Sequence, residues 1–156
     1  MVKDNKNFDI DSNMRDMFDK AKKKINRALH DNVLIPIPLH ASPAFEVGDI
    51  RRNIAAFDLA LGTIEKCVHE ELEAVSPFFL RKVSQETRKY CEDVLDSIIS
   101  KLKDIRDIIV AEKATDEISD DLTLHLNTCL ARVDSLICCV QNLRNGNSMV
   151  RTNSAL

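Results

Sequence analysis

Apolar residues recur every three or four positions along a long central stretch of the chain. The members of this stripe are Ile50, Ile54, Phe57, Leu61, Ile64, Val68, Leu72 and Val75. Because an α-helix turns once every 3.6 residues, this spacing places all of them on one face of a single helix. An apolar face of that length has to be buried against other helices, so the pattern predicts a helical bundle.

Three further segments repeat this spacing, and we expect four long helices at about residues 12–30, 43–75, 77–113 and 116–145. The first carries Met14, Phe18, Ala21, Ile25, Ala28 and Leu29. The third carries Thr87, Val94, Ile98, Leu102, Ile105 and Ile109, and the fourth carries Leu122, Leu126, Cys129, Val133, Leu136, Val140 and Leu143. The predicted fold class is therefore all-α: a single-domain four-helix bundle of long, mostly antiparallel helices.

Short polar side chains and prolines mark where the first three helices are expected to begin. Asp11 or Ser12 is expected to cap the first helix, since a short side-chain oxygen accepts hydrogen bonds from the free amides of a first turn. The second helix is expected to begin at Ser42–Pro43 or at Asp49. Ser76–Pro77 is expected to separate the second helix from the third, because the residue before a proline is pushed out of the helical region.

The fourth helix has candidate caps at both ends. Thr115, Asp116 and Ser119 can supply its start, and Gly146 is the expected left-handed residue past its end. Short turns join the last three helices, which are therefore expected to be antiparallel neighbours. The third helix is longer than the first, and we expect it to overhang the first, exposing apolar surface that invites a homodimer.

A proline-containing apolar crossover is expected between the first two helices, at residues 31–42. Pro36 and Pro38 forbid a regular helix in this segment. Leu34, Ile37 and Leu39 make the segment apolar enough either to pack across the bundle or to dock a partner. Outside the bundle, which spans residues 12–146, we expect a flexible N-terminal arm at 1–11 and a flexible C-terminal tail at 147–156.

Composition agrees with the helical interpretation and narrows the partner classes. The chain has 156 residues, only 3 glycines and 4 prolines, and a net charge of −3. All-β folds use more glycine and proline in turns, and the net charge gives no reason to expect nucleic acid. A local basic cluster stands against this background: Lys20, Lys23, Lys24 and Arg27 share one helix face. That face is either solvated or a site for an anionic partner, such as phosphate or an acidic protein surface.

The N-terminus lacks the apolar segment of a secretory signal, and no stretch approaches the length of a membrane span. We therefore expect no membrane span and a cytoplasmic location. The five cysteines are Cys67, Cys91, Cys129, Cys138 and Cys139. Their number is odd and all fall in predicted helices, so we expect five reduced thiols, with Cys67 and Cys129 buried.

Candidate metal ligands occur at helical spacing in two places. Glu65, His69 and Glu73 share one helix face, and His125 and Cys129 lie one turn apart on another helix. The second pair can hold zinc only if further ligands converge from another helix. Neither set has the H-E-x-x-H pattern or the Glu-x-x-His pair of di-metal bundles. We expect no metal and no cofactor, and a metal-binding bundle stays as a second alternative.

Part of the third and fourth helices resembles the plant invertase and pectin methylesterase inhibitors. Cys91 is followed by Leu95, Ile98 and Leu102, and the later SDDLTLHLNTC contains Ser119, Leu122, Thr128 and Cys129. The resemblance covers about forty residues and implies a secreted helical-bundle inhibitor with a disulfide between Cys91 and Cys129. The sequence departs from the family pattern in three respects: no cysteine precedes Cys67, the family's signal peptide is not found, and Leu95 stands where tyrosine is expected.

No glycine-rich phosphate loop and no serine–histidine–acid constellation is present in the sequence, so we expect no enzymatic activity. The pattern favours a non-enzymatic interaction module: a protein-binding adaptor, an effector or an assembly subunit. An enzyme inhibitor is the alternative. The residues expected to bind the partner are Lys20, Lys23, Lys24, Arg27, Leu34, Ile37 and Leu39. The expected partner is an acidic protein, and a second copy of the chain is a further candidate.

Overall fold

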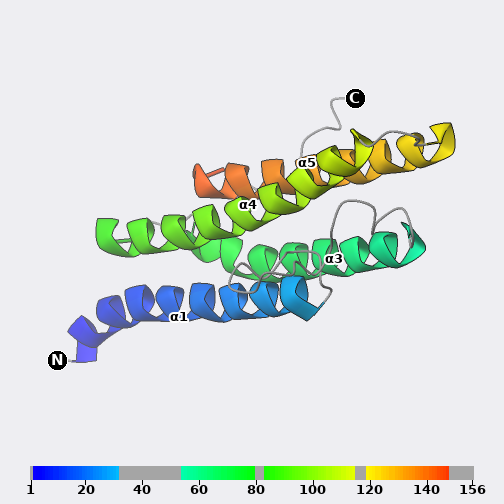
Figure 1. The fold of residues 1–156 in the computed structure, drawn as a ribbon. Coiled ribbons are helices and arrows are strands. Elements are labelled where there is room, and N and C mark those ends of the chain that lie inside the picture. Colours follow the sequence, from blue (N-terminus) through cyan, green and yellow to red (C-terminus); the bar gives the residue numbers. More distant parts are fainter. Residues whose placement is uncertain (1, 32–53, 80–82, 115–118, 148–156) are drawn as a thin grey trace, which may run out of the picture.

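In a computed structural model of the chain, four α-helices form a bundle (Figure 1). They are α1 (Val2–Asp31), α3 (Ile54–Phe79), α4 (Gln85–Lys113) and α5 (Asp120–Arg144). The structure describes residues 2–31, 54–79, 83–114 and 119–147, and these ranges contain no β-strand. The prediction of an all-α four-helix bundle is confirmed.

Successive helices run in opposite directions: α1 and α4 run one way along the bundle, and α3 and α5 return (Figure 1). The main helix contacts are those of α1 with α3 and α4, and of α5 with α4 and α3. The expectation that α4 and α5 are antiparallel neighbours is confirmed. α3 and α4 are antiparallel too, but the expectation that they are neighbours is wrong. They lie across the bundle from each other because each packs its apolar stripe between α1 and α5.

The predicted stripes meet in one core. On α3 the buried members are Phe57, Leu61, Ile64, Val68, Leu72 and Val75. Ile54 is only half-buried at the start of the helix, and Ile50 lies outside the described residues. Each fully buried leucine or phenylalanine contributes about 1.5–3 kcal/mol, so the stripes account for the association of the helices.

The start of α1 differs from the prediction. The helix begins at Val2, ten residues before Ser12, so neither Asp11 nor Ser12 is its cap. Residues 2–11 contain no glycine or proline that would stop a helix. Asp11 instead faces α4, where its Oδ1 accepts a hydrogen bond from the Ser84 N–H at 3.5 Å. With 30 residues against 29 for α4, α1 is not the shorter helix, so the prediction that the third helix is longer than the first is wrong.

The break between the second and third predicted helices falls after Pro77 rather than before it. α3 continues through Pro77 to Phe79, and Ser84 caps α4 by accepting from the Thr87 N–H at 3.2 Å. Two contacts explain the longer helix. The buried Phe79 ring packs 5.4 Å from the Phe18 ring, and Arg88 Nη2 donates to the Phe79 carbonyl at 2.7 Å. Burial of the ring and capping of a free carbonyl offset the hydrogen bond that proline removes.

α5 begins at Asp120, four residues later than predicted, and Ser119 is the one of the three candidate caps that caps it, whereas the C-terminal end agrees with the prediction. Ser119 accepts from the Leu122 N–H at 3.1 Å. Gly146 has φ +88°, its N–H donates to the Leu143 carbonyl at 2.9 Å, and the Asn147 N–H donates to the Asn142 carbonyl at 2.8 Å. These two bonds form the Schellman motif that a left-handed glycine permits. Two other predicted features lie outside the described residues: the crossover at 31–42, apart from Asp31 itself, and the start of the second helix.

Candidate functional sites

The basic cluster predicted from the sequence lies on the exposed face of α1. Lys20, Lys23, Lys24 and Arg27 are all exposed. We call these four residues the basic face. Lys24 Nζ lies 3.7 Å from a carboxylate oxygen of Glu71 on α3, and the lysine side chain is 65% exposed. The apolar part of the predicted partner site, Leu34, Ile37 and Leu39, lies outside the described residues.

Positive charge continues beside the basic face, at the seam between α1 and α4. Lys101 Nζ donates to Asn26 Oδ1 at 2.6 Å, which brings this α4 lysine against α1. Burial lowers the pKa of Lys101, and the charge of Lys22 lowers it further. Lys22 therefore adds positive potential at the α1–α4 seam.

A second charged group lies between α3 and α5, which is the opposite side of the bundle from α1. Arg132 bridges two carboxylates of α3: its Nη1 donates to Asp58 Oδ1, and its Nη2 and Nε donate to Glu65 Oε1 at 2.6 and 3.1 Å. The hydrogen bonds that Arg132 donates to Glu65 raise the pKa of Arg132. Arg132 therefore stays charged and holds Asp58 and Glu65 in place.

The first predicted metal set is not assembled. Among the described residues, Glu65, His69 and Glu73 do not bring their ligand atoms together, and Glu65 is bonded to Arg132. The second pair gains a partner. His125 and Cys129 of α5 are joined by Asp58 of α3, with one ligand atom of each lying within 4.8 Å of the others.

This second set, which we call the Asp–His–Cys cluster, comprises Asp58, His125 and Cys129. His125 Nε2 lies 3.9 Å from Asp58 Oδ1, and these two side chains are 42% and 47% exposed. Cys129 is fully buried, and burial raises the pKa of its thiol. Sequence reasoning missed Asp58. The available signal was its position on α3, directly after the stripe residue Phe57 and two turns before Glu65.

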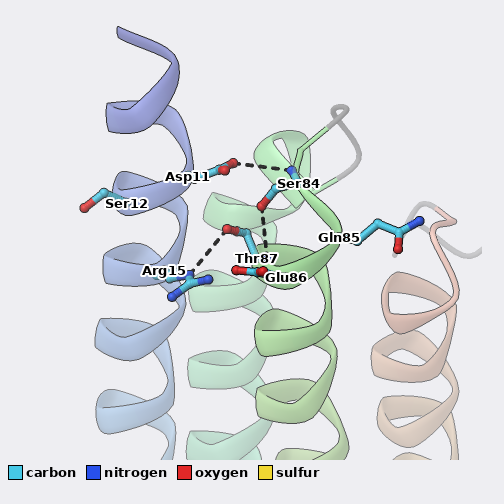
Figure 2. A pocket seen from close by; sticks show the side chains of 7 residues that line it. All are labelled: Asp11, Ser12, Arg15, Ser84, Gln85, Glu86 and Thr87. Atoms are coloured by element: carbon cyan, nitrogen blue, oxygen red, sulfur yellow. Dashed lines mark hydrogen bonds between the residues drawn. The ribbon is translucent and has the colours of Figure 1, made fainter. Parts of the chain in front are cut away.

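A cleft of about 650 Å³ opens near the N-terminal ends of α1 and α4 (Figure 2). Its lining residues are Asp11, Ser12, Arg15, Ser84, Gln85, Glu86 and Thr87. Arg15 Nε donates to Thr87 Oγ1 at 3.3 Å, and Figure 2 shows the polar groups of α1 and α4 bonded to one another. These bonds tie α1 to the start of α4. Sequence reasoning did not identify this cleft.

All five cysteines are free. Cys129 is buried as predicted, but the prediction for Cys67 is wrong, since it is half-buried with its Sγ 3.7 Å from the Lys24 carbonyl. The buried thiols besides Cys129 are Cys91 and Cys139, and Cys138 is exposed.

The disulfide implied by the inhibitor resemblance, Cys91–Cys129, is not formed. Two contacts fix the register of α4 against α5: Arg106 to Asp134 at 2.8 Å and Arg144 to Asp96 at 3.0 Å. In that antiparallel register Cys129 lies across from residues near 111, about twenty residues or roughly 30 Å along α4 from Cys91. A disulfide requires Cα atoms within about 7 Å.

The chain matches no protein-family model, no curated protein and no solved structure. No helix of the described part is both long and apolar enough to cross a membrane.

Proposed function

We propose that the protein is a non-enzymatic helical interaction module that binds an acidic protein surface through its basic face. The observation that carries this proposal is the exposure of four cationic side chains on one face of α1. The whole chain has a net charge of −3. A concentrated positive surface on a negatively charged protein is therefore a local feature, suited to a partner of opposite charge.

The neighbourhood of the basic face supports the same partner chemistry. Lys22 and Lys101 place further positive charge at the α1–α4 seam, where the pKa of Lys101 is lowered by burial and by Lys22. A carboxylate-rich partner relieves this repulsion between cations when it binds. The rigid support comes from α1 itself, whose opposite face is anchored in the core by Phe18, Ile25 and Leu29.

The test is charge reversal on the basic face. Partners captured by the full chain are identified, and their affinity is then measured for the natural protein and for a Lys20→Glu/Lys23→Glu double variant. We expect the double variant to bind about tenfold or more weakly and with a smaller dependence on salt, because two attractive charges become repulsive.

The matched control is Lys66→Glu/Lys103→Glu. Lys66 of α3 and Lys103 of α4 are exposed, so this variant has the same net charge without touching α1. The proposal predicts near-natural affinity for the control. Equal weakening by both double variants, or none by the α1 variant, contradicts it. Mapping amide shifts upon addition of polyglutamate gives an independent measurement, with the largest shifts expected along α1.

We also propose a cytoplasmic location, which the five free thiols support because a reducing compartment keeps thiols unpaired. A homodimer belongs to the same proposal as a further partner. Val110, which is exposed near the end of α4, offers apolar surface for it. The mass of the full chain in solution, measured by light scattering over a range of concentrations, tests the dimer.

A further inference from the structure

The Asp–His–Cys cluster meets the condition set for a zinc site, which is that a further ligand reaches His125 and Cys129 from another helix. His125 and Cys129 alone are two donors from one helix, and the structure adds Asp58 from a second helix. Convergence of donors from separate helices is what distinguishes a site from residues at helical spacing on one surface. The three donor atoms are a carboxylate oxygen, an imidazole nitrogen and a sulfur, all within 4.8 Å of one another.

We propose that Asp58, His125 and Cys129 bind one Zn²⁺ ion, with water at the fourth position. In a tetrahedral zinc site with bonds of 2.0–2.3 Å, ligand atoms lie about 3.3–3.8 Å apart. The 3.9 Å between His125 Nε2 and Asp58 Oδ1 is close to this spacing. The largest separation in the cluster, up to 4.8 Å, closes with about 1 Å of side-chain movement.

The donor set selects zinc over the other common divalent ions. Mg²⁺ and Ca²⁺ prefer sites made entirely of oxygen ligands, whereas only one of the three side chains in this cluster offers oxygen. Zn²⁺ accepts sulfur, nitrogen and oxygen together in tetrahedral geometry. Three protein ligands and an open fourth position are the arrangement of accessible zinc sites, and the exposure of Asp58 and His125 provides the path for entry.

Arg132 supplies the outer shell. Its guanidinium donates to Asp58 and to Glu65, and carboxylates that bind metals are themselves generally held by hydrogen bonds. Zinc binding breaks the Cys129 S–H bond, forms a Zn–S bond and releases the proton to solvent. The charges then balance: Zn²⁺ and Arg132 are offset by Asp58, Glu65 and the Cys129 thiolate.

The consequence for the fold is a metal link between α3 and α5. A ligand that binds the folded state alone raises stability in proportion to the logarithm of its concentration over Kd. The inference is independent of the proposed function, since the cluster lies across the bundle from α1. If the zinc proposal fails, the proposed binding function is unaffected, and the reverse also holds.

The test uses the full chain, purified, treated with a chelator and titrated with Zn²⁺, with bound metal measured by elemental analysis. Co²⁺ serves as the spectroscopic probe, because cobalt–thiolate charge transfer and the visible bands of tetrahedral cobalt report the ligands directly. We expect one metal per chain. Cys129→Ser is expected to lose the charge-transfer band, and His125→Gln to weaken binding more than about 100-fold, since even outer-shell partners are worth 10- to 100-fold.

Two variants serve as matched controls. Cys138→Ser removes an exposed thiol from the same helix, and His69→Gln removes a half-buried histidine from α3. Both are expected to bind metal like the natural protein. His125 is partly exposed, so its variant is expected to keep its helix content by circular dichroism and remains informative if the buried Cys129 variant fails to fold. Absence of stoichiometric metal, or equal loss in His69→Gln and His125→Gln, overturns the proposal.

Discussion

The basic face of α1 and the Arg132 cluster between α3 and α5, which comprises Arg132, Asp58 and Glu65, use similar charged side chains in opposite ways. On α1, four cations point to solvent, and Lys24 contacts a carboxylate only at 3.7 Å. Between α3 and α5, one arginine, only 26% exposed, donates to two carboxylates of another helix. Charges satisfied within the molecule stabilise the fold, whereas exposed charges of one sign are available to a partner. Position relative to the apolar stripe decides which role a charge takes.

Exposed and buried side chains also differ among the thiols, and the largest predicted effect is the difference in their reactivity. Cys138 is exposed, whereas Cys129 on α5 and Cys91 on α4 are buried. Burial raises the pKa of Cys91 to about 12, so this thiol stays protonated at neutral pH. Because the thiolate is the nucleophile, we expect one thiol per chain to react fast with a thiol reagent and the others to react orders of magnitude more slowly.

Mass spectrometry of the singly labelled protein checks this prediction, with Cys138 as the expected site. Under denaturing, non-reducing conditions all five thiols are expected to react. A count of three would instead indicate a disulfide and would favour the secreted-inhibitor alternative over a bundle with free cysteines.

The second prediction concerns the contribution of Arg132 to stability. Arg132→Gln is expected to lower the free energy of unfolding by about 2 kcal/mol, because it removes charge-assisted hydrogen bonds and leaves two carboxylates of α3 without their cation. Urea unfolding in the presence of a chelator, with the slope unchanged, measures the loss without any contribution from metal. A loss below about 0.5 kcal/mol would mean that the cluster is no more stabilising than a surface ion pair.

The apolar stripes were predictable because they repeat over many turns, and most of the buried positions on the four helices followed from periodicity. Ala28 and Leu122 are half-buried members of these stripes, and the buried Ile137 and Cys139 lie outside them. The helix ends were less predictable. Pro77 suggested a break on local grounds, but burial of Phe79 and its contacts with Phe18 and Arg88 come from segments distant in sequence. Tertiary packing therefore overrode a local signal.

Of the two candidate sites, one could be predicted from local sequence and the other depends on tertiary packing. The exposure of the basic face could be predicted, since its residues lie on one helix opposite its own stripe. The Asp–His–Cys cluster could not, because the sequence does not give the register of α3 against α5. Asp58 is 67 positions from His125 in the sequence, and nothing local identifies it as the third donor.

A smaller effect is expected at Gly62, which lies beside the Arg132 cluster in the middle of α3. A Cβ added there would lie 3.6 Å from Arg132 Nη2, an ordinary van der Waals contact. Alanine is favoured over glycine in a helix interior by roughly 0.5–1 kcal/mol. Gly62→Ala is therefore expected to raise the thermal midpoint by a few degrees, as followed by circular dichroism. Destabilisation would show that the guanidinium needs more room than this contact allows.

The smallest effect on stability is predicted for the basic face, when one of its cations is replaced by glutamine as in Arg132→Gln. Lys23→Gln exchanges an exposed cation of α1 for the same neutral side chain. Asp19 lies four residues earlier on the same helix, and a helical pair of this spacing is worth at most about 0.2–0.5 kcal/mol. We expect the free energy of unfolding to change by no more than about 0.5 kcal/mol in urea at moderate salt. A loss of unfolding free energy comparable with that of Arg132→Gln would show that the basic face stabilises the bundle. Its exposed charges would then no longer support a binding role.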